Sequence, residues 1–117
     1  MDASETVDAL SSLAQETRLA IYRLLVQQGP AGLTAGAIGE KVGVMASSLS
    51  FHLAHLTRAG LVTQRRASRN LIYAADFAAM NGLMGYLTEN CCGGQACAPV
   101  CEPKPATKPR PRQRRSA

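Results

Sequence analysis

The sequence is poor in aromatic residues and lacks any long apolar run. Only 4% of its 117 residues are aromatic and none is tryptophan, although 46% are hydrophobic. We therefore expect one domain with a core of aliphatic side chains. No stretch approaches the roughly 18 apolar residues that a membrane-spanning helix needs. The acidic first residues are not followed by the apolar segment of a secretory signal.

Cysteine is missing from the first 90 residues, and all four cysteines then fall between positions 91 and 101. A small secreted domain stabilised by disulfides would distribute its cysteines through the fold. The observed distribution favours the reducing cytosol and thiols that act together, because a buried structural cysteine needs no second thiol beside it. A short segment containing Gly93 and Gly94 can bring several thiolates onto one soft ion.

Excess charge is missing from the first 101 residues, where seven Lys and Arg side chains balance seven Asp and Glu side chains. The whole net charge of +5 lies in residues 102–117, which also hold four prolines and no large apolar side chain. We predict that this tail is disordered. It is either a solubilising end or a non-specific contact with nucleic-acid phosphates.

Apolar spacing and helix-ending residues predict a mainly α protein with one small β-hairpin. The third and fourth predicted helices are joined by a short glycine-containing turn, which is the arrangement of a helix-turn-helix. A hairpin with arginines near its tip follows as a wing. The predicted helices span residues 5–13, 16–28, 35–42, 46–59 and 76–90, and the predicted strands span 61–65 and 71–74. Thr34 is the expected N-cap of the third helix, and Gly43 is expected to end it.

The sequence therefore predicts a winged helix-turn-helix in three parts. Residues 1–90 form the DNA-binding and dimerisation domain, residues 91–101 form a cysteine-rich segment that binds a metalloid, and residues 102–117 form the disordered basic tail.

The fourth helix carries small hydroxyl side chains at its start, on the side away from its leucines. Such side chains allow close approach to a DNA groove, and the positive end of the helix favours phosphate. The alternative is that the serines only cap the helix. We expect His52 to anchor the helix by hydrogen bonds, with a metal shared by His52 and His55 as the alternative. The predicted DNA contacts are Ser47, Ser48, Ser50, Phe51 and His55 of the helix and Arg65, Arg66 and Arg69 of the wing.

Apolar residues of the first and last helices predict a dimer interface. Pairing through these helices would place two fourth helices about 34 Å apart, on successive major grooves of a near-palindromic site. The predicted interface residues are Val7, Leu10, Phe77, Met80, Leu83, Met84 and Leu87.

Three segments resemble the ArsR/SmtB family of metalloregulatory repressors, and the resemblance covers roughly residues 7–90. The segments are AQETRLAI from Ala14, SFHLAHL from Ser50 and AGLV from Ala59. The resemblance implies a winged-helix homodimer that represses its own operon and leaves double-stranded operator DNA when a metal or metalloid binds.

The chain departs from the family at both of the family's common metal sites. It has no cysteine on the third helix and no histidine on the last helix. The wing reads Ala67-Ser68-Arg69 in place of a common Glu-Gly-Arg, and Phe51 replaces a frequent arginine. What remains resembles an arsenic-responsive branch with a Cys-Cys pair at the end of the last helix and a third cysteine several residues on. Cys91, Cys92 and Cys97 match that pattern, and Cys101 is a further candidate.

The thiol chemistry favours arsenite as the inducer. Trivalent arsenic is soft and binds three thiolates, whereas a four-thiolate zinc site commonly uses paired C-x-x-C motifs that this segment lacks. We expect As(III) at Cys91, Cys92 and Cys97, with Sb(III) binding at the same thiols. Zinc or cadmium held by all four cysteines is the next alternative, and disulfide sensing the third.

The same segment argues against an enzyme. The negative end of a helix disfavours thiolates at Cys91 and Cys92, and no arginine lies between Cys91 and Cys101 to bind an anionic substrate. We therefore predict a cytoplasmic, arsenite-responsive repressor that acts as a homodimer on DNA and not at a membrane. The alternatives are a zinc-, cadmium- or redox-responsive winged-helix repressor, or a thiol-rich metal-buffering protein.

Overall fold

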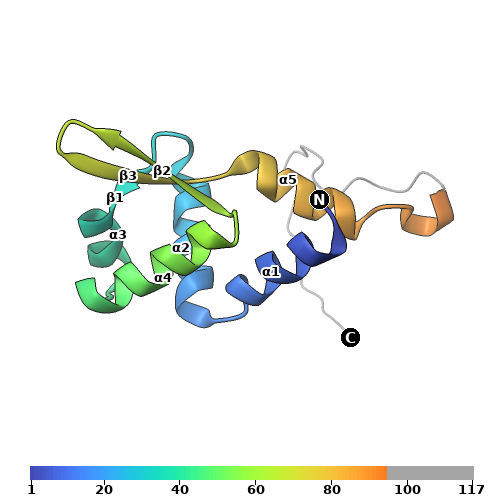
Figure 1. The fold of residues 1–117 in the computed structure, drawn as a ribbon, viewed down its shortest axis with the longest axis horizontal. Coiled ribbons are helices and arrows are strands. Elements are labelled where there is room, and N and C mark those ends of the chain that lie inside the picture. The colour runs from blue at the N-terminus through green and yellow to red at the C-terminus, as the bar shows by residue number, and fades with distance from the viewer. Residues whose placement is uncertain (95–117) are drawn as a thin grey trace, which may run out of the picture.

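The computed structural model describes residues 1–94, in which five α-helices pack around a small antiparallel sheet (Figure 1). This arrangement confirms the predicted winged helix-turn-helix. The elements are α1 (Ala3–Leu13), α2 (Glu16–Gln28), β1 (Leu33–Thr34), α3 (Ala35–Val42), α4 (Ala46–Arg58), β2 (Val62–Ala67), β3 (Asn70–Ala75), α5 (Phe77–Leu87) and the 3-10 helix η1 (Cys91–Gly94).

Side-chain caps set the starts of several helices. Asp2 and Glu5 form a capping box, so α1 begins two residues before the predicted start. The Thr34 hydroxyl accepts from the Ala37 N–H at 3.2 Å, as expected for the cap of α3. The Asp76 carboxylate accepts from the Ala79 N–H at 3.1 Å, which makes Asp76 the cap of α5 and not its first residue.

The predicted end of the last helix is wrong. Helix α5 stops at Leu87 and not at residue 90. The Thr88 hydroxyl donates to the Met84 carbonyl at 2.8 Å, and the backbone of Asn90 adopts a positive φ of 58°, which an α-helix cannot continue through. The cysteine pair therefore lies beyond the helix, after a turn.

The sheet has the order β1-β3-β2, and all of its neighbours are antiparallel. Strands β2 and β3 form the wing, whose two-residue turn is Ser68-Arg69 between the paired residues Ala67 and Asn70. Strand β1 was not predicted, because two residues are too short for a period-two pattern. It joins the other edge of β3 and ties the entry of α3 to the wing.

The core is aliphatic, as expected from the scarcity of aromatic residues. Its fully buried large side chains come from α2, α3, α4 and the segment after α4, and they are Ile21, Leu25, Ile38, Leu53, Leu56 and Leu61. Burial of Leu49, Leu53 and Leu56 fixes which face of α4 points inward, so the opposite face is free to contact a partner.

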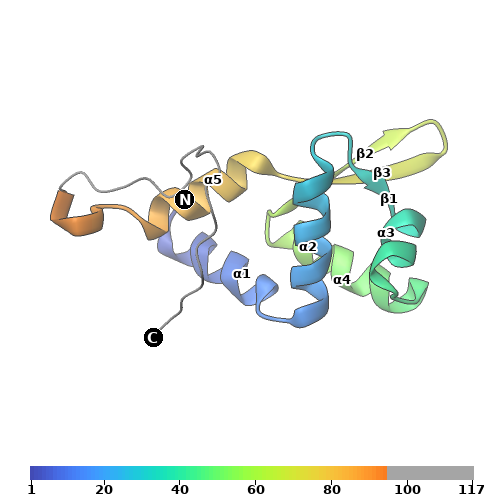
Figure 2. The ribbon, with the colours of Figure 1, turned by 180° about the vertical axis from the view of Figure 1, so that it is seen from behind.

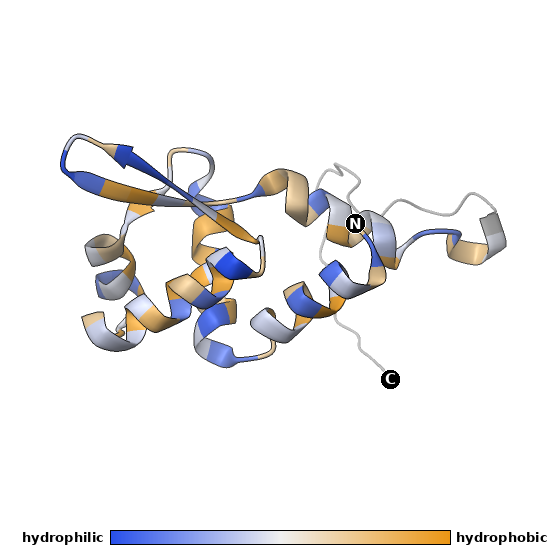
Figure 3. Cartoon of the chain, viewed as in Figure 1, coloured by the Kyte–Doolittle hydropathy of each residue, from blue (hydrophilic) through white to orange (hydrophobic). Residues whose placement is uncertain are grey.

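The two predicted functional regions lie at opposite ends of the molecule. The start of α4 and the tip of the β2–β3 hairpin lie at one end, whereas α1 and α5 extend toward the other, as both views show (Figures 1 and 2). The distal part of the hairpin is mostly hydrophilic (Figure 3). None of the helices described is both long and apolar enough to cross a membrane.

Candidate DNA interface and thiol site

Helices α3 and α4 form a tight helix-turn-helix because two glycines permit it. Gly43 ends α3 in the left-handed conformation, with φ 78° and ψ 40°, and its N–H donates to the Gly39 carbonyl at 2.8 Å. A Cβ on Gly39 would lie 3.1 Å from the Val44 carbonyl oxygen and 3.3 Å from a Leu49 methyl group. The close approach of the two helices thus depends on the missing side chain at residue 39.

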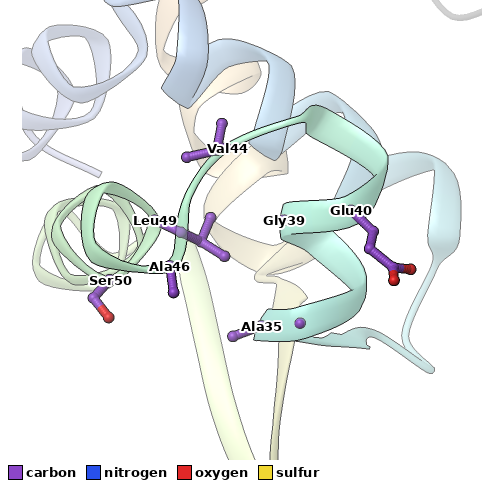
Figure 4. Close-up of a pocket in the computed structure, with 8 residues that line it drawn as sticks. Ala35, Gly39, Glu40, Val44, Ala46, Leu49 and Ser50 are labelled. Carbon is purple, nitrogen blue, oxygen red and sulfur yellow. The ribbon is translucent and has the colours of Figure 1, made fainter.

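A shallow pocket separates the exposed edges of these two helices (Figure 4). Leu49 points from α4 toward α3, whereas Glu40 and Ser50 point away from the space between the helices. The outward direction of Ser50 leaves its hydroxyl on the solvent side of α4, where it could meet a partner.

The first turn of α4 has no side-chain cap. Met45 occupies the cap position and makes no capping hydrogen bond. Ser47, Ser48 and Ser50 are exposed, and within residues 1–94 no hydrogen bond holds their hydroxyl groups. The serines therefore do not serve as the N-cap, and both the hydroxyls and the helix N–H groups are available to bind phosphate or base edges.

Phe51 lies one turn after Ser47 and Ser48 and is 61% exposed. Its ring contacts the ring of His52 with centroids 5.7 Å apart and the ring of His55 at 6.3 Å, both edge to face. A large apolar group is thus held on the outer face of α4.

The two histidines of α4 point toward the junction of α1 and α2. Arg18 donates through Nε to the Ser12 carbonyl at 2.7 Å, and its Nη1 lies 3.3 Å from Nδ1 of His52. Because arginine only donates, this Nδ1 must accept, and His52 is neutral in this arrangement. Burial, the charge of Arg18 and His55 all lower the pKa of His52. The predicted anchoring role of His52 is therefore confirmed.

His55 takes part in the same junction. Its Nδ1 lies 3.2 Å from Oγ of Ser12, a side chain that is fully buried. Contact of His55 with DNA stays a prediction. Sequence reasoning missed Ser12 and Arg18, because nothing in their local pattern shows that residues 34 to 43 positions later pack against them.

The three wing arginines are all exposed, but they are not equivalent. Arg65 donates to the carbonyl oxygens of Pro30 at 3.4 Å and Ala31 at 3.1 Å, so it ties the wing to the loop after α2. Within the part of the chain that the structure describes, no hydrogen bond holds the guanidinium group of Arg66 or of Arg69, although the backbone of Arg66 pairs with that of Leu71. Among the wing residues, these two guanidinium groups are thus available for DNA phosphates.

The thiol site begins with Cys91 and Cys92, which are both exposed and whose sulfur atoms lie 3.7 Å apart. That separation is longer than the roughly 2.05 Å of a disulfide. It is close to the distance of about 3.8 Å between two ligands of one tetrahedral ion with bonds of about 2.3 Å. The two sulfur atoms are thus spaced like two ligands of one soft ion.

Two further points correct or limit the predicted site. Since the pair follows the turn after α5, the helix dipole acts too far away to govern its reactivity. Cys97 and Cys101 lie outside the described residues, as does the tail 102–117. Over residues 1–94 no three His, Cys, Asp or Glu side chains form a group that could hold a metal.

Exposed apolar side chains gather on α1 and α5. Of the predicted interface residues, Val7, Leu10, Met84 and Leu87 are exposed, and Tyr86 joins them. Met80 is half-buried, and Phe77 packs against the core. Leu83 is buried within its own chain, which leaves little of its side chain for the predicted interface.

The chain is similar to known transcriptional regulators. Residues 13–65 match a family described as a helix-turn-helix domain. The nodulation protein NolR of Rhizobium meliloti is 34% identical over 88 residues, which are 75% of this chain and 70% of NolR.

Solved structures share the fold. An ArsR-like transcriptional regulator from Rhodococcus sp. RHA1 has a TM-score of 0.67 at 25% identity, covering 78% of this chain and 82% of that one. A possible transcriptional regulator for arsenical resistance has a TM-score of 0.59 at 30% identity, covering 68% and 80%. The homodimeric winged helix-turn-helix domain of Mb0332 from Mycobacterium bovis has a TM-score of 0.59 at 23% identity, a likeness of fold alone that covers 81% and 88%.

Proposed function

Because the chain belongs to the ArsR/SmtB-like family of winged helix-turn-helix transcriptional regulators, we propose that it represses transcription and releases its operator when arsenite binds Cys91, Cys92 and a third cysteine. The observation that supports arsenite as the ligand is the exposed pair of vicinal thiols, with sulfur atoms 3.7 Å apart, that follows α5. The likeness to a possible regulator of arsenical resistance supports the same ligand.

In this proposal, the end of the molecule that carries α4 and the wing binds DNA. The open first turn of α4 and its exposed serines would enter the major groove, and Arg66 and Arg69 would contact the flanking backbone. Arg65 fixes the position of the wing. The described body carries no excess charge, so this local arrangement, and not the overall field, directs the contact.

In the same proposal, the opposite end of the molecule forms the dimer interface. The exposed apolar side chains of α1 and α5 would pair with those of a second copy. Two copies would then present two α4 helices to successive major grooves of a near-palindromic operator.

The thiols adjoin the dimer face, which supports a coupling between the two. Bound arsenite would supply a pyramidal centre for three thiolates. Cys91 and Cys92 supply two, and Cys97, or otherwise Cys101, would supply the third, with release of the thiol protons. Because residues 88–94 directly follow α5, an ion that ties their thiols to a third cysteine would change how α5 meets its partner. A coupling free energy of about 1–3 kcal/mol is typical and would suffice for partial release.

The experiment is a fluorescence-anisotropy titration of fully reduced protein on an operator duplex selected from random DNA. Arsenite should release wild-type protein, and Cys91→Ser or Cys92→Ser should abolish the release without weakening DNA binding. Cys97→Ser and Cys101→Ser form a matched pair. The substitution that removes the third arsenite ligand should abolish release of the duplex, and the other should not. If arsenite releases both Cys91→Ser and Cys92→Ser from the duplex at the concentrations that release wild type, the assignment of these cysteines as ligands is refuted. Release by zinc or peroxide, but not by arsenite, would favour the alternative regulators.

A further inference from the structure

Phe51 is an exposed apolar side chain on the face of α4 that also carries the hydroxyl groups of Ser47 and Ser48. It is 61% exposed and follows Ser47 and Ser48 by four and three residues, so it continues their face of α4. The buried leucines occupy the other side of the helix. A phenyl ring exposed to this extent has few apolar contacts in its own chain, and it lies where the proposed function places DNA.

The ring is held in place from behind. His52 and His55 contact it edge to face, and they are in turn hydrogen-bonded to Arg18 and Ser12 of the first two helices. Such support fixes the direction of the ring before any partner arrives, which lowers the entropy lost on binding. The outer face of the ring remains open.

A phenyl ring can neither donate nor accept a conventional hydrogen bond, so it cannot read the polar edges of guanine, cytosine or adenine. In the major groove the matching apolar feature is the C5-methyl group of thymine. We propose that Phe51 is a specificity-determining residue that selects thymine by contact with this methyl group. The inference rests on the proposed function, because it needs α4 to lie in the major groove.

The test uses the full chain and a duplex selected by wild-type protein from random DNA. Thymines of the selected half-sites are replaced one at a time by deoxyuridine, which removes only the methyl group. Burial of one methyl group predicts about a fourfold loss of affinity at the thymine that Phe51 contacts, and no change at flanking positions.

The variant arm is a comparison of Phe51→Ser with Leu19→Ser. Leu19 is also an exposed apolar residue, 43% exposed, but it lies on α2. Phe51→Ser should bind thymine and deoxyuridine duplexes equally, whereas Leu19→Ser should keep the wild-type discrimination. Unfolding midpoints of both variants establish that they are folded.

The outcomes separate this inference from the proposed function. If wild-type protein selects no duplex, the proposed function fails. If it binds a selected duplex but is insensitive to every thymine replacement, or if Phe51→Ser remains as sensitive as wild type, the thymine contact is refuted while the regulator stands.

Discussion

At the scale of single residues, Arg18 links helices α1, α2 and α4. Its N–H is capped by Gln15 at the start of α2, its Nε donates to Ser12 at the end of α1, and its Nη1 donates to His52 of α4. Since α1 carries part of the exposed apolar face, this side chain joins the end of the molecule that carries this face to α4.

His52 should make the stability of the fold depend on pH. Burial, with smaller effects of Arg18 and His55, lowers the pKa of His52 below its ordinary value of 6.5. The unfolded chain therefore binds the proton more readily, and the free energy of unfolding falls as the pH drops through 6.5 toward the folded pKa. His52→Gln keeps a hydrogen-bond acceptor for Arg18 but cannot titrate.

The measurement is chemical denaturation of wild type and His52→Gln between about pH 7.5 and pH 5. Wild type should lose stability on acidification across this range relative to the variant. Parallel curves for the two proteins would contradict the assignment of a neutral, half-buried His52.

Local chemistry identified some of these residues in advance, and tertiary packing decided the others. The anchoring role of His52 was predicted because no other function suited it. Its partner was not predicted, since Arg18 lies 34 positions earlier. Likewise, Arg65 was grouped with the other wing arginines because a sequence does not show that the Pro30–Ala31 loop lies beside the wing.

At the scale of elements, the helix-turn-helix depends on the close contact of α3 with α4. Gly39 faces the Val44 carbonyl oxygen and Leu49, whereas nothing lies within 4 Å of a Cβ built on Gly36, one turn earlier in α3. The two glycines therefore form a matched pair for substitution.

Gly39→Val should force the two helices apart. We expect the free energy of unfolding to fall by about 1–3 kcal/mol, as for other overpacked sites, and the affinity for DNA to fall with it. Gly36→Val should leave both nearly unchanged. Denaturant titration and anisotropy on the selected duplex measure the two effects. Equal behaviour of the variants would show that the contact at Gly39 does not position α4.

The elements themselves were largely predictable, because caps and stop signals lie close to the helices that they bound. Thr34 and Gly43 gave the limits of α3 correctly. The end of α5 was predicted too late, since the apolar stripe continues to Leu87 and residues 88–90 carry no proline or glycine. Strand β1 exists only because β3 offers it an edge, which no local pattern reveals.

At the scale of the whole molecule, exposed apolar surface is concentrated at one end. Six of the ten large hydrophobic residues that are exposed within residues 1–94 lie in α1, in α5 or just before α1. Val7 is 62% exposed and Leu87 is 57% exposed. A monomer rarely leaves a contiguous apolar face uncovered, so this face is the expected dimer interface.

Val7→Glu and Leu87→Glu should each convert a dimer into a monomer, because a charge cannot be buried unpaired at an apolar interface. Affinity for the two-half-site operator should fall at least tenfold, while affinity for a single half-site should change little. Sedimentation equilibrium gives the mass, with Leu19→Glu as the matched control on α2. Dimers formed by both variants would place the interface elsewhere.

The most direct test of the account counts thiols and bound DNA in the same titration. Reduced protein on its operator duplex is titrated with arsenite while reactive thiols and anisotropy are read together. The proposed mechanism predicts that three of the four thiols per chain lose their reactivity in step with operator release. In the Cys91→Ser variant, arsenite should cause neither the loss of thiol reactivity nor the release of the operator. Loss of the thiols with the operator still bound, or release with all four thiols still reactive, would contradict it.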